Sequence, residues 1–155
     1  MDCKSLVGQL RLAVRFFDTS TAWLTEDDEA FSPADGMFTA AQQVAHVAQT
    51  IDWFVEGAFG TGWDMEFPGH ESRVRKVKRI AEARAWLARA VDDAVQVLEA
   101  KSPAELAEPL PEGGIMAGAP RGAIVNGIVE HTAHHRGALA VYARLCGKVP
   151  PMPYV

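Results

Sequence analysis

The sequence predicts an all-α fold, a four-helix bundle with long connections between the helices, and two observations support this. Apolar residues recur at helical spacing over four long segments, and no segment reads as a convincing strand. Glycines, prolines and helix-capping residues gather between those segments, where helices should begin and end. Four long amphipathic helices bury their apolar stripes most economically against one another, so they are expected to form a bundle.

The first two helices are separated by an acidic connection. The first is predicted over Lys4–Leu24, which carries an apolar stripe with charged residues largely off it. The second is predicted to start after a capping box, Thr39-Ala40-Ala41-Gln42, and to run to Phe59. Gly60 then ends it.

The middle of the chain is predicted to hold a long loop and a third helix. The stretch Gly60–Glu71 contains three glycines and one proline, and long loops in small domains are often functional. Trp63 in this loop is expected to be exposed. The third helix is predicted over Ser72–Ala100, and five cations within 73–79 crowd its start, where positive charge opposes the helix macrodipole.

The last part of the chain predicts a short helix and a long one. Ser102-Pro103-Ala104-Glu105 is a second capping box with proline at the first helical position. A final long helix is predicted from near Pro120 to Gly147, a natural C-terminal cap, and Pro150-Pro151 forbids its continuation. The long connections argue against a simple up-down-up-down topology.

Length and composition restrict the class of protein. A chain of 155 residues is typical of one domain, so we expect a single domain over 1–155. Fifteen Lys and Arg against twenty Asp and Glu give a net charge of −5, so nucleic acid is not an expected partner. No apolar run approaches the ~20 residues that span a bilayer. Two distant cysteines and the absence of a secretory signal pattern predict a cytoplasmic protein without membrane contact.

The histidines are the most informative polar residues. His131 and His135 lie four residues apart in the last helix, so their rings project roughly 40° apart on one face, which also carries Ile128 and Tyr142. Two imidazoles one turn apart can bind one metal ion without distorting the helix. They can equally be buried histidines hydrogen-bonded to neighbouring side chains, because this spacing alone is a weak signal.

A metal site needs a third ligand, and helical spacing does not identify it. His46 is the best remaining histidine because it lies on a predicted helix, but it projects to one side of that helix's apolar stripe. Spacing alone favours a histidine that faces solvent or a neighbouring helix. His134 lies roughly 80° from the face of the histidine pair and is expected at its rim.

Three motifs together resemble the DinB/YfiT-like superfamily. The last helix reads His131-xxx-His135-Arg136-Gly137 and continues Tyr142-x-Arg144-Leu145-x-Gly147-x-Val149-Pro150. The segment 38–47, FTAAQQVAHV, resembles the family's second-helix signature, and 102–106, SPAEL, resembles the short segment before its last helix. One departure is Ala138, where the family commonly has a glutamine, so that polar group is missing here.

The resemblance implies a four-helix bundle that holds a divalent metal, such as Zn, Ni or Fe, through His46, His131 and His135. Relatives in this superfamily include thiol-dependent S-transferases that use low-molecular-weight thiols. The resemblance therefore implies a thiol S-transferase that acts on a small-molecule substrate. A hydrolase using metal-bound water and a non-catalytic bundle that binds a ligand or partner are the alternatives. Trp53, His134 and Tyr142 are candidates for the surrounding pocket, and a homodimer is expected.

Overall fold

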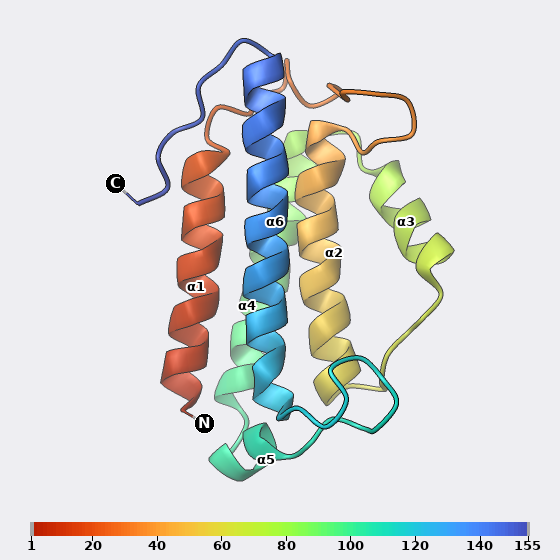
Figure 1. The fold of residues 1–155 in the computed structure, drawn as a ribbon, viewed down its shortest axis with the longest axis vertical. Helices are drawn as coiled ribbons and strands as arrows, with labels where there is room; N and C mark the ends of the chain where they lie inside the picture. The colour runs from red at the N-terminus through yellow and green to blue at the C-terminus, as the bar shows by residue number, and fades with distance from the viewer. Residues whose placement is uncertain (1, 155) are drawn as a thin grey trace.

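The computed structural model describes residues 2–154, and helices dominate it (Figure 1). Within this range the helices are α1 (Cys3–Ser20), α2 (Ala40–Phe59), α3 (Phe67–Lys76), α4 (Ile80–Glu99), α5 (Pro103–Ala107), the 3₁₀ turn η1 (Arg121–Ala123) and α6 (Ile124–Leu145). Residues 2–154 contain no strand, and an isolated bridge joins Pro109 to Pro120. The predicted all-α class is therefore confirmed. None of these helices combines the length and apolar character that a bilayer crossing requires.

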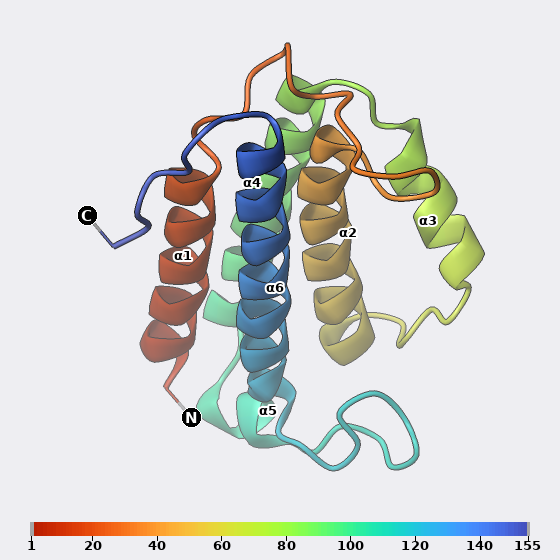
Figure 2. The ribbon, with the colours of Figure 1, turned by 45° about the horizontal axis from the view of Figure 1, so that its top comes forward.

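The four long helices lie side by side, and α3 lies outside them next to α2 (Figures 1 and 2). Helix α2 packs against α4 and α6, and α1 closes the bundle against the other sides of α6 and α4. In Figure 1, α1 and α6 run upward, whereas α2 and α4 run downward. Because α3 carries the chain back to the end at which α2 begins, α2 and α4 are parallel, and the topology is not up-down-up-down.

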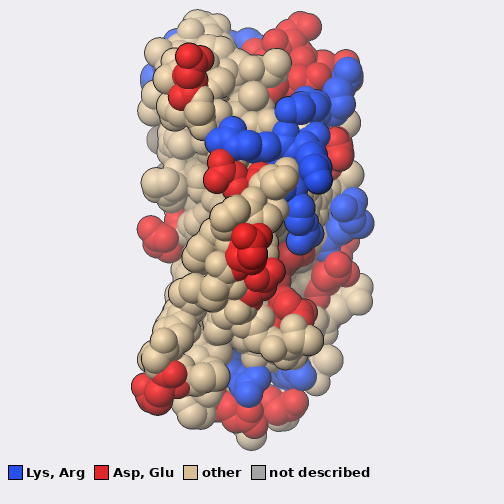
Figure 3. Space-filling view, turned by 90° about the vertical axis from the view of Figure 1, so that its right-hand side faces the viewer, with Lys and Arg blue, Asp and Glu red and all other residues tan. Residues whose placement is uncertain are grey.

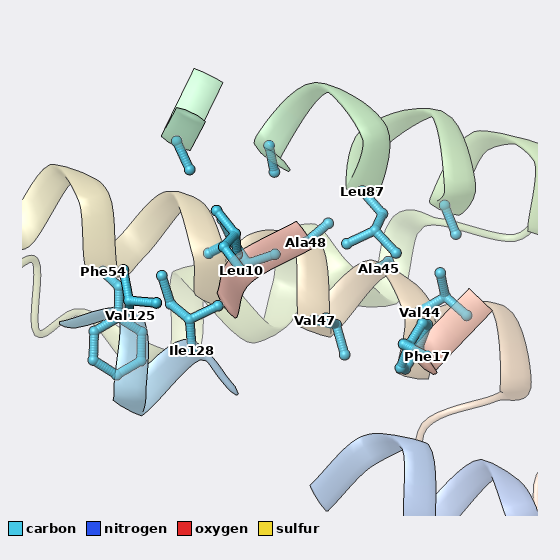
Figure 4. Close-up of a cluster of buried hydrophobic side chains, with 14 of the residues drawn as sticks. Leu10, Phe17, Val44, Ala45, Val47, Ala48, Phe54, Leu87, Val125 and Ile128 are labelled. Carbon is cyan, nitrogen blue, oxygen red and sulfur yellow. The ribbon is translucent and has the colours of Figure 1, made fainter. Parts of the chain in front are cut away.

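The core between these helices is made of aliphatic and aromatic side chains from all four (Figure 4). Leu10 and Phe17 of α1 are fully buried, and Leu87 of α4 and Ile128 of α6 are nearly so. Burial of this apolar surface is the main favourable term in folding. Helices α2 and α4 both contribute buried alanines, among them Ala45, Ala48, Ala83, Ala90 and Ala94.

Both predicted capping boxes are present. The Thr39 hydroxyl accepts from the Gln42 N–H at 3.3 Å, and the Gln42 side chain accepts from the Thr39 N–H at 3.0 Å. Ser102 and Glu105 make the same reciprocal pair at 3.2 and 2.9 Å. Each box satisfies backbone donors that a helix start would otherwise leave without a partner, so local sequence fixes where α2 and α5 begin.

The first helix ends at Ser20, earlier than the predicted Leu24. The Thr21 N–H and hydroxyl both donate to the Phe17 carbonyl, at 2.9 and 2.8 Å, and the chain then turns. Trp23 and Leu24 stay buried as part of this turn. These two apolar side chains pack in the core, so the apolar pattern of the sequence continues beyond the last residue of α1.

The single helix predicted over Ser72–Ala100 is wrong, because the chain forms α3 and α4 with a break at 77–79. Val77 is extended and ends α3. The freed Arg75 carbonyl accepts from the Gln42 side chain at 3.0 Å, and the Ile80 N–H that opens α4 donates to Glu29 at 2.9 Å. Side chains from distant segments therefore satisfy both helix ends.

The basic cluster consequently lies mostly at the end of α3 and in the break after it, and of its five cations Arg79 directly precedes the start of a helix, α4. Arg73, Arg75 and Lys76 occupy the last turn of α3, where positive charge is favoured by the macrodipole. Figure 3 shows the face that α3 covers, with Lys and Arg side chains gathered in its upper half and acidic side chains beside and below them. Arg75 pairs with Glu71 one turn earlier, at 2.7 Å.

Candidate metal centre

His46, His131 and His135 meet where α2 and α6 lie against each other. Each ring offers one nitrogen, and the three nitrogens all lie within 4.8 Å of one another. The ring centroid of His46 lies 5.0 Å from that of His131 and 4.9 Å from that of His135, and the last two rings are 4.4 Å apart. The side of α2 that spacing left unassigned thus faces α6, and the three histidines form a group that could hold a metal ion.

The donor geometry fits a divalent metal. The Nε2 atoms of His131 and His135 are 3.1 Å apart. Two imidazole nitrogens bound to one zinc ion at about 2.0–2.1 Å also lie roughly 3 Å from each other. A set of three neutral nitrogen donors suits zinc, nickel or iron, and it leaves coordination positions open for a further ligand.

Burial keeps these rings in the neutral form that binds metals. It lowers the pKa of His46, and it lowers that of His131 to about 4, with further effects from the charges of His46 and His134. Burial and then the neighbouring histidines lower the pKa of His135 to about 3. A neutral imidazole keeps a free lone pair on one nitrogen, so at neutral pH no proton has to be removed before a metal binds.

Gln43 contacts His135, and Tyr142 in turn contacts Gln43. The side chain of Gln43, which is buried, contacts His135 Nδ1 and donates through its amide nitrogen to the Tyr142 hydroxyl at 3.1 Å. That hydroxyl donates to the Phe38 carbonyl at 2.9 Å. The sequence analysis missed Gln43; the signal that points to it is a polar residue three positions before His46, on the same side of α2.

A cavity of about 850 Å³ opens beside the histidines, between α2, α3, α6 and the loop before α6. His46 and His131 stand in its wall, and His135 lies behind them. The Thr50 hydroxyl, also in the wall, is 3.4 Å from His131 Nε2. Aromatic rings make up much of the remaining surface, namely Phe38, Trp53, Phe54 and Phe67.

Of the three residues predicted around the pocket, Trp53 lines this cavity. Its indole N–H donates to the Asp64 carbonyl at 2.7 Å, and its ring packs 4.8 Å from Trp63, which is half-buried and not exposed as predicted. His134 is exposed beside His135, with ring centroids 4.9 Å apart, outside the cavity wall. Tyr142 is buried, and its hydroxyl is used by the contacts described above.

The charged groups at the cavity are acidic. Glu71 and Glu130 line it, and none of the described residues in its wall is a lysine or arginine. Glu71 is paired with Arg75. Gln49 and Asn126 add uncharged polar groups to the wall. Such a surface favours an apolar ligand that carries no negative charge.

Comparison with known proteins gives a match to a family profile. The profile of the DinB superfamily matches residues 10–139, a span that contains all three histidines, the aromatic wall and Gln43. No curated protein matches the chain.

Proposed function

The chain belongs to the DinB superfamily, and on that premise we propose that it is a metal-dependent thiol S-transferase acting on a small apolar molecule. The observation that carries this proposal is the shared wall: His46 and His131 belong both to the three-histidine group and to the aromatic cavity. A thiol and its acceptor would therefore meet at one place.

The histidines and the aromatic residues have different roles in the proposed reaction. A divalent metal held by His46, His131 and His135 would lower the pKa of a coordinated thiol, and three ligands leave room for that thiol. The aromatic wall binds the acceptor and excludes water. In the transfer, the thiol sulfur forms a bond to an electrophilic carbon of the acceptor, the leaving group departs with the electron pair of its bond, and the thiol proton is released to solvent.

The acceptor is proposed to be flat, apolar and uncharged. A cavity of about 850 Å³ lies within the usual range of small-molecule sites. Trp53, Phe54 and Phe67 offer ring faces that pack on an aromatic ligand. Glu130 in the wall disfavours an anionic acceptor.

The first experiment measures metal by X-ray fluorescence on the purified protein. We expect one equivalent per chain, lost in each of His46→Ala, His131→Ala and His135→Ala. His134→Ala is the matched control, since this exposed histidine on the same helix lies outside the group and its loss should leave the metal content unchanged. Wild-type protein without metal, or loss of metal in the control alone, would reject the proposed site.

The second experiment measures transfer directly. A panel of small thiols is tested for thermal stabilisation of the metal-loaded protein, and a stabilising thiol is then assayed with a chlorinated dinitrobenzene as the chromogenic acceptor. We expect thiol-dependent colour formation that His131→Ala abolishes and His134→Ala retains. Metal-loaded protein that no thiol stabilises would contradict the transferase and favour a hydrolase or a binding role.

A further inference from the structure

Four groups form a buried chain of hydrogen bonds that ends on the metal centre. It runs from His135 Nδ1 to the Gln43 side chain, then to the Tyr142 hydroxyl, and finally to the Phe38 carbonyl. His135, Gln43 and Tyr142 are at most 8% exposed. Buried polar groups without correct partners are costly, so each donor in this chain must face an acceptor.

The chemistry of the chain fixes its direction. A backbone carbonyl can only accept, so the Tyr142 O–H donates to the Phe38 oxygen. With that proton committed, the hydroxyl accepts from the Gln43 side chain, which must present its NH₂ group. The Gln43 amide oxygen then faces His135, so His135 Nδ1 carries the proton. The lone pair of His135 is thereby left on Nε2.

We infer that Gln43 is a positioning residue for the metal centre: anchored by Tyr142, it holds His135 in the Nδ1–H tautomer with the Nε2 lone pair aimed at His131. This rests on the proposed function, because it assigns the atom through which His135 binds the metal. A ligand histidine whose second nitrogen donates to a fixed acceptor is both oriented and more basic.

Gln43 and Tyr142 lie on the same two helices as the three histidines. Gln43 lies one turn before His46 on α2, and Tyr142 lies two turns after His135 on α6. The same two helices thus supply both the ring nitrogens and their support. In the metal-free protein, His131 can donate from Nε2 to His135 Nε2 across 3.1 Å, and His131 frees its Nε2 lone pair for a metal when its proton moves to Nδ1.

The tautomer is tested without metal, by long-range ¹H–¹⁵N NMR of the histidine rings. We expect wild-type His135 to show a protonated Nδ1 and an unprotonated Nε2. Gln43→Leu should shift the ring toward the other tautomer. Gln43→Glu loses the NH₂ donor to Tyr142 but keeps an oxygen acceptor for His135 Nδ1, so it should keep the proton on Nδ1. A wild-type His135 with its proton on Nε2 would overturn the inference.

The consequence for metal binding is measured as zinc affinity, by competition with a chromophoric chelator. Gln43→Leu should weaken zinc binding by about 10–100-fold. Tyr142→Phe, which releases the Gln43 amide, should give a smaller loss, and Gln43→Glu should restore the wild-type order of magnitude.

Gln42→Leu is the matched control for this series. Gln42 is also buried, at the preceding position of α2, but its side chain bonds Thr39 and Arg75 and not a histidine. Its loss should lower stability and leave zinc affinity and the His135 tautomer unchanged. Equal weakening of zinc binding by Gln42→Leu and Gln43→Leu would show a merely structural role for Gln43.

The two proposals fail in different ways. Wild-type protein that binds no zinc, nickel or iron would reject the proposed function, and the tautomer measured in the metal-free protein would still decide the role of Gln43. Zinc binding with thiol transfer, but with the proton of His135 on Nε2, would leave the proposed function in place and reject the positioning role.

Discussion

An ion pair between Asp28 and Lys148 ties the loop after α1 to the segment after α6. Asp28 accepts from the Lys148 ammonium at 2.7 and 2.6 Å through its two oxygens. It also accepts from the Thr25 N–H at 2.9 Å and the Thr25 hydroxyl at 2.8 Å. The Asp28 side chain is 7% exposed, so this carboxylate depends on these partners in place of water.

Asp28→Asn keeps the shape of the side chain and removes its charge. A hydrogen bond to a charged group contributes about 1.5–3 kcal/mol to stability. Lys148 is 37% exposed and regains water when the pair is lost, which places the effect at the lower end. We therefore expect the free energy of unfolding to fall by about 1–2 kcal/mol at neutral pH.

The effect of this substitution should depend on pH. Burial alone would raise the pKa of Asp28, but the hydrogen bonds from Lys148 and Thr25 together lower it below the ordinary value. A carboxylate with a lowered folded-state pKa contributes stability that is complete above its unfolded pKa of about 4 and is lost as the pH falls through the folded value. The difference between wild type and Asp28→Asn should therefore be constant from pH 7 to 5 and shrink below about pH 4.

Urea denaturation followed by circular dichroism at several pH values measures this difference. Asp27→Asn is the matched control, because the adjacent aspartate is exposed and its substitution should change stability little. Equal stabilities of the two variants at pH 7 would refute the reasoning. A difference that stays the same size down to pH 3 would refute the assignment to the charge of Asp28.

Three further predictions concern the cavity, the loop after α2 and the metal. A Cβ added at Gly127 would lie 2.8 Å from the ring of a cavity-wall phenylalanine, whereas one at Gly137 has no atom within 4 Å. Gly127→Ala should therefore reduce the thermal shift given by the dinitrobenzene acceptor, and Gly137→Ala should not. An added Cβ at Gly57 would overlap the Trp63 ring. Gly57→Ala should therefore be less stable in urea, because overpacking costs about 1–3 kcal/mol and the gain in helix propensity is roughly 1 kcal/mol. A more stable Gly57→Ala would contradict this. Zinc at 100 times its Kd should raise the free energy of unfolding by about 2.7 kcal/mol, a gain that a chelator removes and the histidine-to-alanine variants lack.

Local signals in the sequence predicted helix starts well and one helix break badly. The boxes at Thr39 and Ser102 act within four residues, so sequence alone reveals them. The break between α3 and α4 has no glycine or proline, and its free backbone groups are satisfied by Gln42 and Glu29, which are remote in sequence. Such a break depends on tertiary contacts, and the helical spacing of apolar residues continues across it, so the sequence pattern predicts one uninterrupted helix.

Some parts of the candidate site could likewise be predicted from the sequence, and others could not. The convergence of His131 and His135 follows from the helical repeat alone. His46 could not be found from periodicity, because α2 is covered by α3, α4 and α6 and its side position is therefore not a solvent face. The resemblance to a family supplied it. The cavity wall could not be predicted, because it combines two helices with α3 and a loop whose positions only the fold determines.

The origin of the three histidines on α2 and α6 bears on the order of events during synthesis. Helix α6 is synthesised after α2, and before then a nascent chain can present only a single ring of the group. Capture of an ion by all three nitrogens must await the docking of α6 between α1 and α2. The site is thus a long-range one, and a chain cut short before position 131 would hold only one of its three rings.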